Sequence, residues 1–340
     1  MKTIVEQRGE EQVHILRRTD DEEHVWAATC ATAGASVWAG IAVLARVGIA
    51  RVGAIELMFL FAPLVIVPLG MELGRVMGGG SGLEHWAQRV QPLGAALAVV
   101  AIFLAPGRRA GAVALGWMVV CVFMAGAGVG DLVRASGAIA DRSARATRVV
   151  LGIARIDLAV GGAWLVASRL GMRPMGIQEP IGLLTAVHFH FAGFATAMIA
   201  AATLRFADKS RAYRWLQAVA LAVVTMPFVV AAGFVISPAL KMGAGLLFSG
   251  SVAGLAIFVR GCGSKAEDGT ARLLLQVAAG AVFAGMTLSG AYAIADYAGS
   301  DVLTIPQMAR THGILNAVGF CLPGLLGWLV ESGRRREDLW

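Results

Sequence analysis

Charged residues are scarce in this chain of 340 residues. Asp, Glu, Lys and Arg make up 15% of it, whereas 57% is hydrophobic and the mean hydropathy is +0.71. A water-soluble domain needs a polar surface, so this composition excludes an ordinary soluble protein. The apolar residues also form runs of about 20, the length that crosses a bilayer as an α-helix. The sequence therefore predicts an all-α, polytopic transmembrane helix bundle.

Three other patterns are missing. The apolar runs do not alternate with polar residues, which excludes a membrane β-barrel. The Lys and Arg residues do not gather on a folded soluble face, so the net charge of +7 does not indicate a nucleic-acid partner. The four cysteines show no C-x-x-C spacing, so we expect neither a disulfide framework nor a thiolate metal site; they are Cys30, Cys121, Cys262 and Cys321.

Polar residues are concentrated at the two ends of the chain. We expect a polar cytoplasmic tail over 1–24, a transmembrane helical domain over 25–330 and a basic cytoplasmic tail over 331–340. A secretory signal would have its apolar core close to the N-terminus, so no cleavage is expected. Ten spans are predicted, at 25–45, 53–71, 90–106, 110–132, 149–168, 181–204, 215–236, 242–259, 273–297 and 308–330.

Lys and Arg are divided unevenly between the two sides of these spans. Most of them lie on the side of the N-terminal tail, including the stretch 134–148 and the three arginines at 334–336. Loops rich in Lys and Arg stay in the cytoplasm. Both termini are therefore predicted to be cytoplasmic, which also agrees with an even number of spans.

Two histidines lie inside the sixth predicted span. Ionisable side chains inside a membrane are expensive, so they call for a reason. At 1.5 Å per residue, His188 and His190 lie about 11 to 14 Å from the outer end of the span. Residues two apart do not face each other on a helix, so the two imidazoles are poorly placed to ligate one metal. Gly193 shares the face of His190 and permits a close helix approach. We therefore expect His190 to face a functional pocket and His188 to have a structural role.

Span ten repeats this pattern in a weaker form. His312 and Asn316 lie in its first two turns, and Asn316 precedes Gly319 as His190 precedes Gly193. We expect His312 and Asn316 to lie opposite His190. The similarity also hints at an internal duplication.

Acidic residues occur both within the spans and at their ends. Asp157 lies near the middle of span five, where an Asp costs about 2.5 to 3.5 kcal/mol, so it should be buried beneath the pocket with a partner from another span. Arg155 points about 200° away around the same helix and is not that partner. Asp296 ends span nine on the outer side, whereas Glu72 and Asp131 end spans two and four on the cytoplasmic side. Carboxylates at span ends can reach interfacial water, so a structural role is the alternative for these three.

Three stretches together resemble a known family. They are T-A-V-H-F-H-F-A-G-F at 185–194, T-H-G-I-L-N-A-V-G-F at 311–320 and P-L-G-M-E-L at 68–73. In a ten-span chain they look like the YndJ-like family of bacterial integral membrane proteins, over most of the chain after the polar tail. The resemblance implies a multi-pass protein of the bacterial cytoplasmic membrane, and members are sometimes labelled transporters without a defined substrate. The positions that match its motifs are Glu72, His188, His190, His312 and Asn316.

Two main classes of function remain open. In the first, His190, His312 and a carboxylate, either Asp157 or Asp296, form the site of a membrane-embedded acid–base enzyme for a lipophilic small molecule. A metal-assisted site and a bis-histidine haem are variants of this reading, although no ligand spacing indicates either. In the second, the same groups relay protons in a transporter. A receptor or assembly subunit without turnover is a third option.

The two classes differ in where polar groups are needed. A transporter needs access from both faces, whereas an enzyme can enclose its polar groups in one pocket. The outer half of the predicted bundle holds more polar groups than the inner half, which favours the enclosed enzyme site. Membrane lipid and a lipophilic or small-molecule substrate are the expected partners, and the sequence identifies no cofactor.

Overall fold

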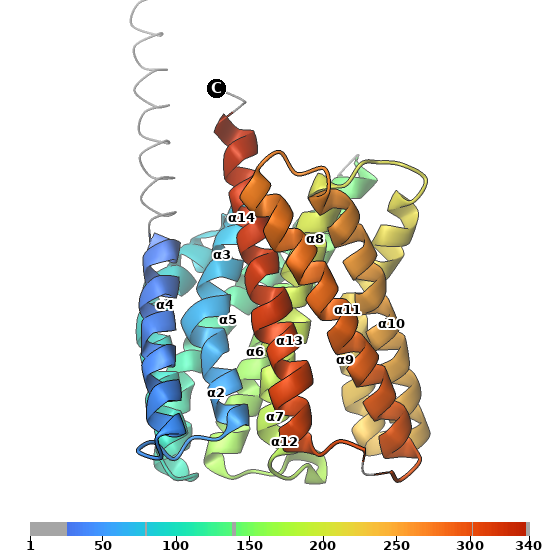
Figure 1. Cartoon of the computed structure of the whole chain (residues 1–340). Helices are drawn as coiled ribbons and strands as arrows, with labels where there is room; N and C mark the ends of the chain where they lie inside the picture. The colour runs from blue at the N-terminus through green and yellow to red at the C-terminus, as the bar shows by residue number, and fades with distance from the viewer. Residues whose placement is uncertain (1–25, 79, 138–140, 301, 338–340) are drawn as a thin grey trace, which may run out of the picture.

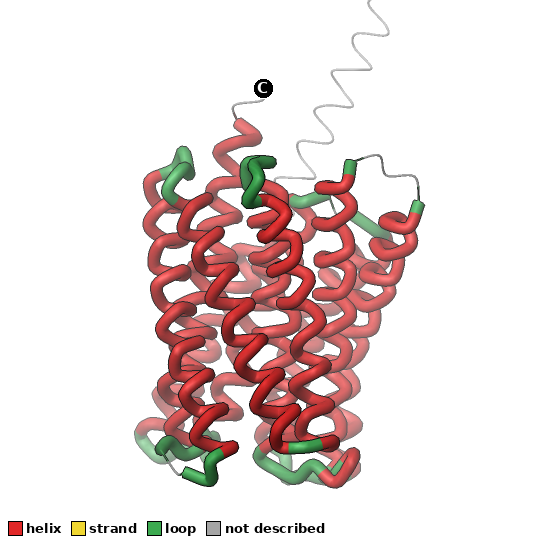
Figure 2. Tube along the Cα trace, turned by 90° about the vertical axis from the view of Figure 1, so that its right-hand side faces the viewer, coloured by secondary structure: helices red, strands yellow, loops and turns green. Residues whose placement is uncertain are grey.

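The computed structural model describes residues 26–78, 80–137, 141–300 and 302–337. The expected N-terminal tail lies outside these ranges. This part of the chain contains no strand, and ten of its helices are long and apolar enough to cross a membrane, which confirms the predicted all-α bundle and its span count. The helices run side by side between two ends (Figures 1 and 2). We call the end at which α14 finishes, at the top of Figure 1, the C-terminal end and the other the distal end.

The ten spans follow one another along the chain. The first is Trp26–Arg46, and the second comprises α2 (Ala54–Phe61), η1 (Ala62–Ile66) and α3 (Val67–Val76). Spans three to five are α4 (Gly82–Phe103), α5 (Arg108–Ser136) and α6 (Arg142–Leu170). Span six comprises α7 (Ile181–His188), η3 (Phe189–Ala195) and α8 (Thr196–Phe206), after the short 3-10 turn η2 (Pro174–Gly176). Spans seven to nine are α9 (Tyr213–Ile236), α10 (Pro238–Gly263) and α11 (Gly269–Tyr297). Span ten comprises α12 (Ile305–Met308), η4 (Ala309–Gly313), α13 (Ile314–Asn316), η5 (Ala317–Cys321) and α14 (Leu322–Glu337).

Several helices extend further than the sequence predicts, and the extensions of α4 and α14 bury polar residues. α4 begins about two turns before the predicted third span, because the Ser81 side chain caps it by accepting a hydrogen bond from the backbone N–H of Glu84 at 3.2 Å. α14 continues to Glu337, so part of the expected tail at 331–340 is helical, and Glu331 within it is wholly buried. In both places polar residues that look like loop or tail are packed inside the bundle.

Spans two, six and ten pack against one another at the centre of the bundle. Each contains π-helical segments, η1 in span two, η3 in span six, and η4 and η5 in span ten. In span two, Pro63 has no backbone N–H and its ring would collide with the preceding helical turn, so the backbone widens there. The Pro63 carbonyl instead accepts a hydrogen bond from Gln91 of α4 at 2.7 Å. π-helical turns occur frequently at functional sites, which draws attention to these three spans.

Six of the seven other spans flank this centre in two groups of three. α4, α5 and α6 pack together on one side, and α9, α10 and α11 pack together on the other (Figure 1). The order therefore repeats: a central span with a π-helical segment is followed by three flanking helices. The segments η1, η3 and η5 begin at Ala62, Phe189 and Ala317, at nearly equal intervals. This arrangement supports the internal duplication that the sequence suggests.

Candidate functional site

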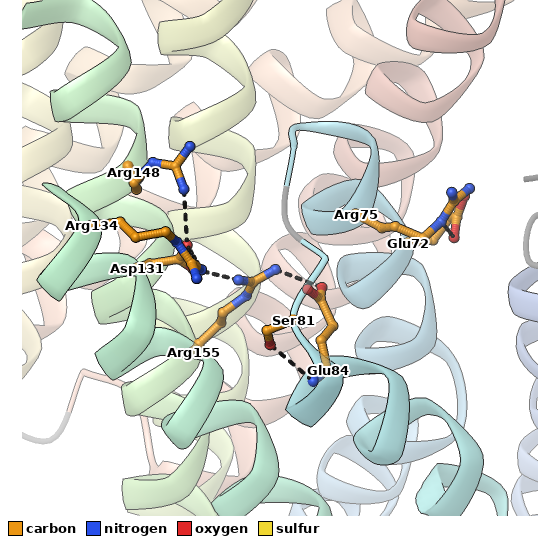
Figure 3. A network of polar contacts seen from close by, with 8 residues as sticks. All are labelled: Glu72, Arg75, Ser81, Glu84, Asp131, Arg134, Arg148 and Arg155. Carbon is orange, nitrogen blue, oxygen red and sulfur yellow. Dashed lines mark hydrogen bonds and ion pairs between the residues drawn. The ribbon is translucent and has the colours of Figure 1, made fainter. Parts of the chain in front are cut away.

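An ion-pair network joins α4, α5 and α6 near the C-terminal end (Figure 3). At its centre the wholly buried Arg155 donates to Glu84 of α4 at 2.6 Å and to Asp131 of α5. Arg134 and Arg148 also pair with Asp131, at 2.9 and 3.6 Å. A long side chain on a helix points toward the helix N-terminus, which directs Arg155 to the level where α4 begins and α5 ends. One buried guanidinium thus bridges two buried carboxylates, and Arg134 and Arg148 add further positive charge beside Asp131.

Sequence reasoning missed Glu84, because the third span was expected to begin after it. The spacing Ser81-Gly-Leu-Glu84 is the S-x-x-E signature of a helix N-terminus, and it is the signal that would have placed Glu84 inside the helix. Glu72 lies apart from the network and pairs with Arg75 one turn away on α3, at 2.7 Å (Figure 3). The C-terminal half of the bundle therefore contains more charge than the sequence suggests.

Asp157 is wholly buried in the middle of α6. It packs directly against the backbone of η3, where a Cβ atom at Gly193 would lie 2.9 Å from the Asp157 carboxylate. Neither carboxylate oxygen has a hydrogen-bond partner within the described ranges. The partner that we expect from another span is thus absent there, although burial in the bundle is as expected. Burying a carboxylate charge without a partner is strongly unfavourable, whereas the neutral acid is tolerated.

His190 is wholly enclosed between α5, α6 and α2. Its Nδ1–H donates to the Ala186 carbonyl at 2.7 Å, and its Nε2 accepts from the Trp117 indole N–H at 2.9 Å. The ring also meets Phe59 edge to face, with the ring centroids 5.2 Å apart. Gly161, one turn from Asp157 on α6, makes room for the imidazole, since a Cβ there would lie 2.6 Å from Nδ1. Both nitrogens of His190 are therefore occupied.

His188 differs from His190 in both burial and hydrogen bonding. Its side chain is exposed, and its Nδ1–H donates to the Leu184 carbonyl at 2.7 Å. His188 lies within electrostatic range of His312 of span ten. His190 instead points to the side of the bundle formed by α5 and α6, because residues two apart diverge around a helix.

His312 and Asn316 are both half-buried in span ten. The Nδ1–H of His312 donates to the Gly285 carbonyl of α11 at 2.9 Å, and the Asn316 amide donates to the backbone carbonyl of His312 at 2.6 Å. Asp296, at the distal end of α11, pairs with Lys241 of α10 at 2.7 Å. Of the predicted site residues, the structure thus brings His188 near His312 and Asn316, while Glu72 and Asp296 are in local ion pairs elsewhere.

The described residues hold no group of three or more His, Cys, Asp and Glu side chains placed to bind a metal ion. His190 offers no free lone pair to a metal or to haem iron, since both ring nitrogens are engaged. His188 and His312 each use Nδ1 and leave Nε2 as an acceptor. The arrangement can therefore hold a proton on Asp157 and accept hydrogen bonds at two imidazoles.

Comparison with known proteins places this architecture in a family. The family model described as YndJ-like protein matches residues 57–320. The chain belongs to the YndJ-like family. This family member is also similar to the uncharacterized membrane protein YndJ of Bacillus subtilis (strain 168), with 30% identity over 189 residues. That match covers 55% of this chain and 33% of the relative, so the chain spans about a third of the length of the relative that it matches. No solved structure matches.

Proposed function

We propose that this YndJ-like membrane protein is a secondary transporter that couples the passage of a small molecule to proton movement. Asp157 is the group that binds and releases the proton. The observation that carries the proposal is the buried Asp157 carboxyl, whose two oxygens have no partner in the described chain. Acids at such depth are typical of proton relays in pumps and transporters.

The other buried acids serve as an internal comparison. Glu72 is held by Arg75, Glu331 by Arg335, and Glu84 and Asp131 by Arg155. Each of these carboxylates has a guanidinium beside it that stabilises its charge. Asp157 has none, so its neutral form is favoured at rest and its charged form needs an incoming cation, a donor or water. That is the property a proton carrier requires.

The distribution of polar groups supports transport over an enclosed enzyme site. The preference for an enzyme rested on an inner half that is poor in polar groups, and Glu84 with its partner Arg155 removes that basis. Asp157 lies between this network toward the C-terminal end and the histidines toward the distal end. Polar groups therefore occur at successive depths along the bundle.

The architecture gives a second line of support. Repeated units of spans are common in secondary transporters, whose sites lie near the bilayer midplane at irregular helices. Asp157 and η3 have this placement, with Gly193 in contact with the carboxyl. We further propose that the C-terminal end faces the bacterial cytoplasm, since the Lys and Arg residues are concentrated there.

The test is a flux assay in proteoliposomes loaded with a pH-sensitive dye. Amino acids, sugars, organic acids and lipophilic alcohols are supplied in turn under an imposed pH gradient. We expect at least one class to elicit proton flux that falls at least about tenfold in Asp157→Asn and persists in Asp157→Glu. Flux that is equal in Asp157→Asn and the unaltered protein contradicts the proposal. Conversion of a supplied compound to a product in detergent, with no dependence on a gradient, supports the membrane-embedded enzyme instead.

A further inference from the structure

In the distal half of the bundle span six separates from the flanking helices α9 to α11, and we call the surface at which His188 and Phe228 are exposed the crevice. η3 and α8 pack against α9, whereas α7, the distal part of the same span, is not packed along α9, α10 or α11. Phe228 of α9 marks the point of divergence, because its ring packs against Phe189 at 5.4 Å and yet remains 41% exposed. His188, the residue next to Phe189, is exposed just where α9 leaves span six. The exposure of an imidazole inside a span distinguishes this crevice from ordinary lipid-facing surface.

Two imidazoles within electrostatic range of each other have the same hydrogen-bonding state here. In His188 and His312 Nδ1 lies against a backbone carbonyl, which cannot donate, so the neutral ring has its proton on Nδ1. The Asn316 amide nitrogen is also 3.2 Å from Nδ1 of His312, but it donates to the His312 carbonyl at 2.6 Å. Nε2 is then a bare acceptor in both rings, with no partner in the part of the chain that the structure describes. The half-buried His312 and the exposed His188 thus offer two acceptors and no donor to whatever enters.

The charges around the crevice narrow the chemistry of its occupant. Asp296, an acid at the distal end, is paired with Lys241 at 2.7 Å, and the Lys241 ammonium also lies over the Phe234 ring at 5.1 Å. This pair is neutral as a whole, and the exposed Arg310, two residues before His312, projects from a different face of span ten. Two neutral acceptors beside aromatic surface instead suit a molecule with a hydroxyl donor on an apolar body.

We infer that the crevice binds a lipophilic hydroxyl compound drawn from the membrane, with its hydroxyl donated to Nε2 of His188 or His312 and its apolar chain against Phe228. This inference rests on the proposed function and names the substrate class of the same pathway. The compound reaches the imidazoles through the space between α7 and α9. From there Asp157 is the next polar group along the bundle toward the C-terminal end.

The experiment is photo-crosslinking of the purified full-length protein in lipid nanodiscs. The probe is a long-chain alcohol with a diazirine near the middle of its chain, and the matched control probe is its methyl ether, which lacks the donor. We expect the alcohol to label peptides around Phe228 about fivefold more than the ether does, the ratio for one hydrogen bond of ordinary strength. Equal labelling by the two probes overturns the inference without recourse to any variant.

Variants of the two histidines then test which imidazole accepts the hydrogen bond from the alcohol. His188→Phe and His312→Phe keep an aromatic ring but remove the Nε2 acceptor, so the double variant should lower labelling by the alcohol to the level of the ether, and the single variant with the larger loss identifies the acceptor. His85→Phe, on α4 at the C-terminal end, is the matched control and should leave labelling unchanged. Melting temperatures of all these variants show whether the fold is kept. A folded double variant that labels like the unaltered protein contradicts the inference.

Asp157→Asn separates this inference from the proposed function. It should abolish proton-coupled flux and leave labelling by the alcohol unchanged, because Asp157 lies outside the crevice. Labelling without any coupled flux in the unaltered protein supports the binding site and refutes transport. Coupled flux of another solute class, with no preference of the protein for the alcohol over the ether, supports transport and refutes the lipophilic alcohol as substrate.

Discussion

Arg155 and Asp157 stand two residues apart on α6, and both are wholly buried. Arg155 is enclosed by carboxylates from two other helices, whereas Asp157 faces the glycine backbone of η3 and has no partner among the described residues. The cost of burying a charge is similar for the two, so the difference lies in what the neighbouring helices supply. Pairing marks Arg155 as part of the framework, and the absence of a pair is the basis on which we propose that Asp157 changes its protonation state.

The two histidines of span six show the same contrast. His190 has both nitrogens engaged and no exposed surface, whereas His188 keeps Nε2 free and is exposed. The enclosed histidine is the one that sequence reasoning favoured as functional. A polar residue inside a span therefore indicates function only after its hydrogen-bond partners have been counted.

The largest effect is expected for Arg155→Met. It leaves Glu84 and Asp131 buried without their shared counterion, and breaking such a pair costs about 3 to 5 kcal/mol. Thermal unfolding in detergent should show a large loss of stability. Arg134→Met is the matched control, since Arg134 also pairs with Asp131 but its side chain is 47% exposed. Equal losses in the two variants would mean that burial does not set the importance of the guanidinium.

Gly193→Ala should have the next largest effect. The new methyl group would lie 2.9 Å from the Asp157 carboxylate, and relieving that overlap costs about 1 to 3 kcal/mol of stability. Gly280→Ala on α11 meets open space and should be neutral, which provides the control. In the double variant Gly193→Ala, Asp157→Gly every Asp157 side-chain atom that the methyl group would meet is gone, so the stability losses should not add. Strict additivity would show that Gly193 and Asp157 are not in contact.

Trp117→Phe tests whether His190 belongs to the framework. The change removes the indole donor from Nε2 of His190 and leaves a buried acceptor unpaired. Hydrogen bonds between membrane helices contribute about 0.6 to 1.7 kcal/mol, so a small but measurable drop in melting temperature is expected, with transport retained. Trp86→Phe, at a position that is 52% exposed, should have no effect. Loss of transport in a stable Trp117→Phe protein would assign His190 a functional role.

Asp157→Asn should change stability by less than about 1 kcal/mol, because no ion pair is broken. Its expected effect is on transport alone. The decisive comparison is with Arg155→Met under the same conditions, because that variant should lose stability. A loss of stability in Asp157→Asn as large as in Arg155→Met would reveal a structural partner for this carboxyl.

The smallest effect is expected at the surface of the C-terminal end. There a hydrogen bond from Lys265 at 2.5 Å holds the pKa of Asp208 below its ordinary value of 3.8. A lowered pKa means that the pair contributes above the ordinary pKa and that its contribution is lost as the pH falls through the lower one. Both side chains are more than two-thirds exposed, so Asp208→Asn should leave the melting temperature unchanged at pH 7. A clear shift at pH 7 would show that exposed pairs also stabilise this protein.

Much of the fold is readable from local pattern. Each apolar run near 20 residues has to become a helix in lipid, since its backbone polar groups have no other partner there. The ten spans follow from this rule. The similar stretches 185–194 and 311–320 overlap the π-helical segments η3, η4 and η5. Span boundaries were harder to predict, because a polar residue such as Glu84 looks like a loop until its capping spacing to Ser81 is considered.

The candidate site, too, could be predicted from the sequence only in part. That Asp157, His188 and His312 are polar groups at membrane depth follows from hydropathy, a property of neighbours in the chain. Which of them has a partner depends on neighbours in space: Glu84 and Arg155 are 71 residues apart, and Trp117 and His190 are 73 apart. A hydropathy pattern contains no information on which helices adjoin. Helix packing in this fold therefore determines that Arg155 is paired with two carboxylates and that both nitrogens of His190 are bonded. It also leaves Asp157 and the Nε2 atoms of His188 and His312 without a partner among the described residues.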